Sequence, residues 1–243
     1  MNFNENFKDL VYKSNLKTDE YYNGKIKDVG NPYYIGFGNP NAKILIFGKE
    51  KAFSEKEEKK LKYESIGNPK EWKYYVENLI TYHKEPFYLN TNYVNAFYPY
   101  QTTNKSGRTW QKYEVLINKI YDKNDFNHND FFKDAFLSEI NYKPSKTSKI
   151  KKFKDPIRIE FLKNDFYKSF KVIFLACADY LSPEQIQEIF NVNFSQDLSK
   201  PRNRIKIYKN ENLLVINTRQ LSFDVSDKYL DTLAGIAKEN IRL

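Results

Sequence analysis

Cysteine and histidine are scarce in this chain, and their scarcity excludes several kinds of site. The single cysteine, Cys177, cannot form an intramolecular disulfide, an iron-sulfur cluster or a cysteine-rich zinc site within the chain. Because Cys177 lies in the apolar run 172–178, we expect a buried thiol rather than a nucleophile. The two histidines, His83 and His128, lie in polar segments far apart in the sequence. We assign neither a role, and we expect no metal and no cofactor.

Long apolar stretches, linkers and internal repeats are also absent from the sequence. No segment approaches the roughly 20 apolar residues of a membrane span, and the start, MNFNENFKDL, lacks the apolar region of a signal peptide. We expect a cytoplasmic monomer with no membrane partner. No Pro-, Gly- or Ser-rich segment divides the chain, so we expect a single domain over 1–243. Within it, 1–30 would form an N-terminal extension, and 51–108 and 143–156 would be inserted or loop segments.

The charge balance favours a polyanionic partner. Forty Lys and Arg residues against 31 Asp and Glu residues leave a formal net charge of +9. A field of this sign attracts nucleic acid. Lys greatly outnumbers Arg and the chain is rich in Asn, Ile, Tyr and Phe, which an AT-rich genome would impose on any protein, so both explanations stay open.

Four short apolar runs, bounded by polar or turn-forming residues, are typical of buried strands. Segments with helical spacing fall between and after them, which indicates a parallel sheet with helices on both faces. We predict an α/β fold with three αβα layers around a central, mainly parallel four-stranded sheet. The predicted strands are 43–47, 135–140, 171–176 and 213–217, and the predicted helices are 54–63, 69–82, 109–121, 157–169, 182–190 and 226–242.

Two local patterns add detail to this prediction. Residues 204–208 and 213–217 flank the polar turn 209–212, which is typical of a hairpin, so the sheet is expected to carry an antiparallel strand. The sequence Ser182-Pro183-Glu184-Gln185 has an N-cap residue, a proline at the first helical position and an acidic first turn. It predicts the start of a helix that continues to Phe190.

Three polar turns follow three of the predicted strands. They are 48–51 after the first strand, 139–142 at the end of the second and 217–222 after the last. Open α/β sheets place their sites at the carboxyl ends of the strands. If these strands share one sheet, the three turns meet at one edge, and we expect the chemistry there.

The order of these segments resembles the uracil-DNA glycosylase superfamily. The stretch GNPNAKILIFGKE (38–50) is similar to the first motif of that family, a hydrophobic strand ending in a glycine-led turn. The stretch FLSEINYKPSKT (136–147) resembles the strand that reads the base, and FKVIFLACADYL (170–181) resembles the next buried strand. NTRQLS (217–222) is similar to the second motif in its position, its Asn and its Leu-Ser pair. The resemblance extends over roughly 36–237.

The chain departs from the family at specific positions. No proline follows Glu50 in the first motif, and Glu139 stands where relatives usually have Asn. Asn217 replaces the usual His of the second motif, with Thr218 and Arg219 in place of Pro-Ser. The iron-sulfur cysteines of one branch are missing.

The resemblance implies a metal-free DNA glycosylase, which hydrolyses the N-glycosidic bond of a damaged, mismatched or modified base flipped out of single- or double-stranded DNA. Cleavage builds positive charge on the sugar and negative charge on the departing base. Glu50 is expected to stabilise the cation and orient water, and Asn217 to donate its amide to the base or the water. Tyr100 is the candidate for stacking on the base, and Leu221 or Phe223 for filling the gap.

Glu139, together with Gly48, is expected to contact the base. An ionised carboxylate only accepts hydrogen bonds. It would suit the exocyclic amino group of cytosine or adenine and would repel the carbonyl edge that an Asn amide reads. The hypothesis is that plain uracil is not the best substrate.

Basic residues near the turns are expected to contact DNA phosphates, because a lysine run follows the base-reading strand directly. Arg219 is expected to neutralise a flanking phosphate or the leaving base. The predicted DNA-binding residues are Lys49, Lys51, Lys143, Lys146, Lys149, Arg219, Leu221 and Ser222.

Plainer interpretations stay open for the same residues. Glu50 also fits a solvated turn carboxylate paired with a neighbouring lysine, Glu139 a strand-end carboxylate, and Asn217 a turn residue. A lysine run is often only a solvated face. Two other functions also remain open: a nucleic-acid-binding protein that keeps the fold without catalysis, and a glycosidase acting on free nucleosides or nucleotides.

Overall fold

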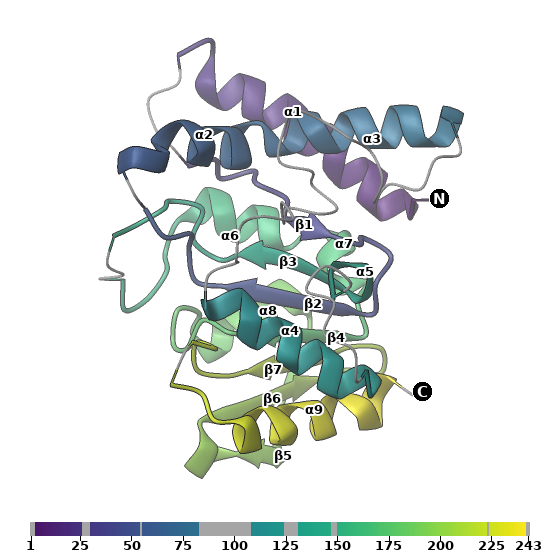
Figure 1. The fold of residues 1–243 in the computed structure, drawn as a ribbon, viewed down its shortest axis with the longest axis vertical. Helices are drawn as coiled ribbons and strands as arrows, with labels where there is room; N and C mark the ends of the chain where they lie inside the picture. Colours follow the sequence, from purple (N-terminus) through teal and green to yellow (C-terminus); the bar gives the residue numbers. More distant parts are fainter. Residues whose placement is uncertain are drawn as a thin grey trace.

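The computed structural model describes residues 3–25, 30–53, 55–82, 108–123, 131–146, 150–222 and 224–241. Within these residues the fold is α/β, with one mixed seven-stranded sheet (Figure 1). Three of its strand pairings are parallel and three are antiparallel. Across the sheet the strands are β1 (Phe37–Gly38), β3 (Ala135–Glu139), β2 (Ile44–Gly48), β4 (Val172–Leu175), β7 (Leu214–Asn217), β6 (Ile205–Lys209) and β5 (Asn193–Lys200).

The four predicted strands are confirmed, and they form the parallel centre of the sheet as β3, β2, β4 and β7. Their residues are almost all buried, as expected for parallel strands covered on both faces. The predicted hairpin is confirmed as β6 and β7. The prediction of a four-stranded, mainly parallel sheet is wrong, because antiparallel strands extend both edges. β1 is only two residues long and β5 is polar and exposed, so neither has the apolar pattern of a buried strand.

Helices lie on both sides of the sheet in Figure 1. Two of them, α4 and α9, lie side by side in front of the sheet, and α6, α7 and α8 lie behind it. Phe47 of β2 contacts the rear helices, with ring centroids 5.4 Å from Tyr167 and 6.0 Å from Phe190. These helices are α4 (Arg108–Tyr121), α9 (Asp227–Ile241), α6 (Pro156–Leu162), α7 (Asp165–Lys168) and α8 (Pro183–Phe190).

The N-terminal segment and the segment after β2 form helices that gather beside β1 (Figure 1). Phe7 packs with its ring centroid 4.9 Å from Trp72 and 4.8 Å from Phe166, so these segments share the hydrophobic core of the sheet. Asn4 caps the first helix by accepting a hydrogen bond from the N–H of Asn6 at 2.8 Å. The elements are α1 (Glu5–Tyr22), the 3-10 helix η1 (Glu55–Glu57), α2 (Glu58–Ile66) and α3 (Asn68–Tyr82).

Most predicted helices are confirmed, with two divisions. The predicted helix 54–63 corresponds to the 3-10 helix η1 followed by α2. The predicted helix 157–169 is two helices, because Asn164 ends the first segment and caps α7 by accepting from the N–H of Phe166 at 2.9 Å. The predicted start of α8 is confirmed, with a capping box between Ser182 and Gln185. A short helix, α5 (Phe131–Asp134), precedes β3. None of the helices in the described ranges is long and apolar enough to cross a membrane.

Candidate functional site at the carboxyl edge of the sheet

Two of the predicted polar turns lie side by side, because the backbones of β2 and β3 stay paired beyond the ends of the strands. The N–H of Ile140 donates to the carbonyl of Gly48 at 3.0 Å, and the N–H of Asn141 donates to the carbonyl of Lys49 at 2.7 Å. The first polar turn is therefore held against the second at the carboxyl edge of the sheet.

Glu50 lies in the first turn, and hydroxyl groups hold both of its carboxylate oxygens. Ser145 donates to Oε1 at 3.0 Å, and the almost fully buried Tyr180 donates to Oε2. Ser145 follows β3 and Tyr180 follows β4, so three parts of the chain meet at this carboxylate. Lys49 is close by, with its Nζ 5.1 Å from the centroid of the Tyr180 ring. These contacts make Glu50 an oriented carboxylate.

Glu139 is the last residue of β3 and lies beside Gly48. Its carboxyl group occupies the space that a β-carbon at position 48 would need. Such a carbon would lie 2.3 Å from Glu139 Oε2 and 3.1 Å from the hydroxyl oxygen of Tyr113 in α4. Oε2 is buried and has no hydrogen-bond partner among the described residues. Burial raises the pKa of Glu139 to about 8, while Lys51 lowers it and Glu50 raises it. This shift favours the protonated form of Glu139 at neutral pH, whereas the sequence suggested an ionised carboxylate.

Lys51 lies inside this site. Its side chain is only 13% exposed, and its Nζ lies 3.4 Å from Glu64 Oε2. The same Nζ lies 4.5 Å from the ring centroid of Tyr34 and 4.7 Å from that of Phe37. This position differs from the predicted contact with DNA and instead puts a positive charge near Glu139.

Arg158 holds the site from behind the sheet. Its side chain is fully buried in α6, and burial lowers the pKa of its guanidinium. Its nitrogens make five hydrogen bonds to oxygens of the loop before β1 and of the end of β3, which together fix the backbone that carries Glu139. The acceptors are the carbonyls of Pro32, Tyr34, Glu139 and Ile140 and the hydroxyl of Ser138.

Asn217 lies at the same edge but faces the other side of the sheet. Phe47, Leu175 and Asn217 are in register, so their side chains point to one face. Glu139 is in register with Gly48, one residue further along β2, and therefore points to the opposite face. Three strand spacings of about 4.8 Å separate β3 from β7, about 14 Å in total. Glu139 and Asn217 thus lie at one edge of the sheet, as expected from the sequence, but on opposite faces of it.

The turn after β7 is attached to α9 and to its own side chains. The hydroxyls of Thr218 and Tyr229 share a hydrogen bond, and the guanidinium carbon of Arg219 lies 5.5 Å from the centroid of the Tyr229 ring. Arg219 Nη2 lies 3.2 Å from Asp224 Oδ2, and Ser222 donates to Asp224 Oδ1 at 2.8 Å. Arg219 and Ser222 thus lie near the surface, where DNA could reach them.

The remaining predicted DNA-binding residues are divided between core and surface. Leu221 is fully buried, so the structure gives it a packing role that does not favour insertion into DNA, and insertion stays a prediction. Lys143 is exposed, with its Nζ 5.5 Å from the ring centroid of Tyr142. Lys146 is also exposed and lies 2.6 Å from Glu55. Tyr100, Lys149 and Phe223 lie outside the described residues.

Four residues around the two carboxylates were missed by the sequence interpretation. Ser145 and Tyr180 come soon after predicted strands, so the rule that located Glu50 could also have found them. Tyr113 and Arg158 lie on helices among apolar residues, and no local pattern shows which strand a helical side chain will contact.

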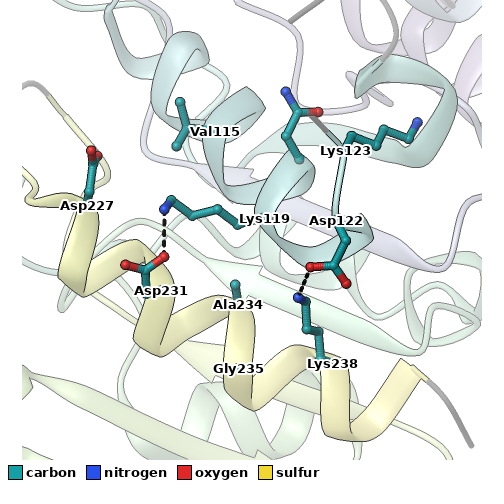
Figure 2. Close-up of a pocket in the computed structure, with 10 residues that line it drawn as sticks. Val115, Lys119, Asp122, Lys123, Asp227, Asp231, Ala234, Gly235 and Lys238 are labelled. Carbon is teal, nitrogen blue, oxygen red and sulfur yellow. Dashed lines mark hydrogen bonds and ion pairs between the residues drawn. The ribbon is translucent and has the colours of Figure 1, made fainter. Parts of the chain in front are cut away.

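A hollow of about 690 Å³ lies between α4 and α9 (Figure 2). Lys119 Nζ lies 2.6 Å from Asp231 Oδ1, and Lys238 Nζ lies 2.5 Å from Asp122 Oδ1, so ion pairs bridge the two sides of the hollow. None of the residues that line it belongs to the predicted site.

Cysteine and groups of acidic or histidine side chains were the remaining places for a thiol or a metal site. Cys177 is buried as predicted, and burial raises the pKa of its thiol to about 12. Among the described residues, no group of three or more His, Cys, Asp or Glu side chains is placed to hold a metal ion.

Comparisons with known proteins leave the function to be argued from this geometry. The chain matches no protein-family model, no curated protein and no solved structure.

Proposed function

We propose that this protein is a DNA glycosylase of the uracil-DNA glycosylase type, with a three-layer αβα arrangement, acting on a damaged, mismatched or modified base. The observation that carries the proposal is a pair of unlike carboxylates at the carboxyl edge of the parallel strands. Glu50 is oriented by two hydroxyl groups, whereas Glu139 is protonated and has a buried oxygen without a partner. Buried polar atoms without partners are rare in folded proteins, and each one calls for an explanation such as an absent ligand or water.

Glu50 is the proposed catalytic carboxylate. Water adds to the anomeric carbon of the sugar, its proton passes to Glu50, and the electron pair of the broken bond leaves with the base, which is then protonated. The negative charge of a carboxylate at this position stabilises the positive charge that develops on the sugar. Ser145 and Tyr180 each use one lone pair of the carboxylate, so lone pairs remain to orient the water.

Glu139 is the proposed base-reading residue. A protonated carboxyl group donates one hydrogen bond and accepts others. It can therefore pair with a carbonyl beside an N–H, as on uracil or hypoxanthine, and with a ring nitrogen beside an amino group, as on cytosine or adenine. Neutral Glu139 thus no longer argues against uracil. Bases read through the donated proton should be bound less well as the pH rises through about 8.

One assay tests the proposal directly. Oligonucleotides carrying uracil, hypoxanthine, xanthine, mismatched thymine or modified cytosines are incubated with the protein, and abasic sites are detected by alkaline cleavage. We expect release of at least one base, loss of that release in Glu50→Gln, and its retention in Glu211→Gln. Glu211 is the matched control, because it is an exposed carboxylate in the β6–β7 turn at the opposite edge of the sheet.

A second candidate function is DNA binding without catalysis. It is favoured by the position of Asn217, which faces away from Glu139 and so leaves the second motif without a side chain beside the base-reading residue. DNA binding with no base released from any oligonucleotide would support this candidate. If the protein neither binds DNA nor releases a base, free nucleosides become the substrates to test.

A further inference from the structure

The hairpin that joins β5 to β6 carries a cluster of positive charge that the sequence interpretation did not use. Three basic residues occur within five positions at its tip, which is a 3-10 turn, η3 (Pro201–Asn203), closed by the N–H of Arg204 donating to the carbonyl of Pro201 at 2.9 Å. Arg204 adopts a left-handed conformation with φ 56°, which reverses the chain into β6. We define the tip cluster as Lys200, Arg202 and Arg204, all of them exposed.

The strand register places the tip cluster at the same sheet edge as the candidate site. β6 runs antiparallel to β7, and Lys206 is in register with Asn217, the last residue of β7. The two residues before Lys206 therefore continue past the carboxyl end of β7, toward the turn that carries Arg219. Figure 1 shows β5 and β6 at the far end of the sheet from β1, so the tip extends this edge away from Glu50.

Tyr229 is subject to the positive charges of both Arg204 and Arg219. Burial raises the pKa of the Tyr229 hydroxyl, and the positive charges of Arg219 and Arg204 both oppose that rise. Two guanidiniums from different elements therefore act on one ring at this end of the edge. Guanidinium groups suit phosphates because they present paired N–H donors.

The tip cluster is not neutralised by the rest of the described protein. Many exposed lysines elsewhere lie within 4 Å of a carboxylate, as Lys206 does at 3.7 Å from Asp179. Among the described residues, none of the three tip side chains makes an ion pair. The whole stretch 193–209 has five basic residues and one acidic residue, Asp197. An unneutralised cluster of this kind keeps its attraction for an external anion.

We propose that the tip of the β5–β6 hairpin is a phosphate-binding arm, which holds the DNA strand on the far side of Asn217 while the flipped nucleotide reaches Glu50 and Glu139. The inference rests on the proposed function only in taking DNA as the ligand. The arm binds the sugar-phosphate backbone, so it contributes affinity without sequence preference.

The test compares two triple variants with the same change of charge. Lys200→Gln, Arg202→Gln and Arg204→Gln remove the tip cluster. Lys43→Gln, Lys171→Gln and Lys209→Gln remove three charges from exposed residues at the opposite edge of the sheet. Binding to a fluorescent duplex, and to the corresponding single strand, is measured by anisotropy between about 50 and 200 mM NaCl.

We expect the tip variant to bind duplex DNA about tenfold more weakly at the lower salt concentration, and to reduce the slope of log affinity against log salt by about 2 to 3. The opposite-edge variant should change the slope by less than about 1. Both variants should unfold at the same urea concentration as the parent, because all six side chains are exposed.

The inference would be overturned if the tip variant and the parent had equal slopes of log affinity against log salt. It would also be overturned if the two triple variants lost equal affinity for the duplex, or if the parent did not bind DNA. Base release provides a separate measurement. If no base is released but the salt dependence of DNA affinity is reduced in the tip variant, the proposed glycosylase function is wrong and the phosphate-binding arm is supported. If a base is released and the tip variant binds like the parent, the arm alone fails.

Discussion

Along the carboxyl edge of the sheet, the part formed by β2 and β3 differs from the part formed by β7 and β6 in how deeply charged side chains are buried. At the end formed by β2 and β3, three charged groups are partly or fully buried and each is held: Glu50 by two hydroxyls, Lys51 beside Glu64, and Arg158 by five acceptors. At the end formed by β7 and β6, Arg219 and Arg204 lie near the surface. Buried, oriented charges suit chemistry because they need little reorganisation. Exposed charges suit the binding of a polyanion.

The register of the parallel strands explains this division. Successive residues of a strand face opposite sides of a sheet, so a shift of one residue changes the face. Glu139 aligns with Gly48, whereas Asn217 aligns through Leu175 with Phe47. Glu139 and Asn217 therefore lie on opposite faces of the sheet, although each is the last residue of a parallel strand.

The largest difference is expected between Arg158, which is buried beside β3, and Arg219, which follows β7 near the surface. Arg158→Met should lower the free energy of unfolding by about 3 to 5 kcal/mol, because several buried oxygens lose their donor. Arg219→Met should cost less than about 1 kcal/mol, since its ion pair with Asp224 is exposed. Urea unfolding measures both, and similar losses in the two variants would contradict the comparison.

The rate of base release should also depend more on Glu50, at the β2 and β3 end, than on Asn217 at the end of β7. Glu50→Gln is expected to slow base release by about 100- to 1,000-fold under single-turnover conditions, with DNA affinity nearly unchanged. Asn217→Ala should cause a much smaller loss of rate, because Asn217 faces away from Glu139. An equal loss of rate in Asn217→Ala would show that both ends contribute to the chemistry.

The protonation of Glu139 predicts a pH dependence of stability. The unfolded chain releases this proton near the ordinary pKa of 4.5, and the folded protein releases it near pH 8. The folded state therefore holds the extra proton between these values, and Glu139 costs progressively more stability as the pH rises from about 5 to about 8.

Glu139→Gln should remove this cost. The variant should nearly match the parent at pH 5 and be more stable by about 4 kcal/mol at pH 9. Glu211→Gln, measured in parallel by urea unfolding, should show no such trend. A constant difference between Glu139→Gln and the parent at every pH would mean that Glu139 is ionised throughout.

The smallest effect concerns the attachment of the turn after β7 to α9. Thr218→Val removes the hydrogen bond with the Tyr229 hydroxyl and should cost about 1 kcal/mol. Thr232→Val is the control, because Thr232 is partly exposed on α9 and donates to the carbonyl of Lys228 within its own helix, and it should cost less than about 0.5 kcal/mol. Thermal unfolding distinguishes the two values, and equal losses would mean that the bond to Tyr229 adds nothing.

Much of the fold followed from local pattern. The runs that became β2, β4 and β7 are apolar because both of their faces are covered, and the capping box of α8 is visible in four consecutive residues. β5 was missed because its exposed residues follow no apolar alternation. In the site, Glu50 and Glu139 were found because they end strands, whereas Arg158 and Tyr113 reach the site from helices distant in sequence.

The sequence by itself determined which residues end the parallel strands, because buried strands are continuous apolar runs that stop where polar residues begin. It thereby placed Glu50, Glu139 and Asn217 at one edge. Only the tertiary structure decided which face each side chain occupies, because the face depends on a register set by neighbouring strands. It also decided the proton on Glu139, because that proton depends on how deeply the folded chain buries the carboxyl group.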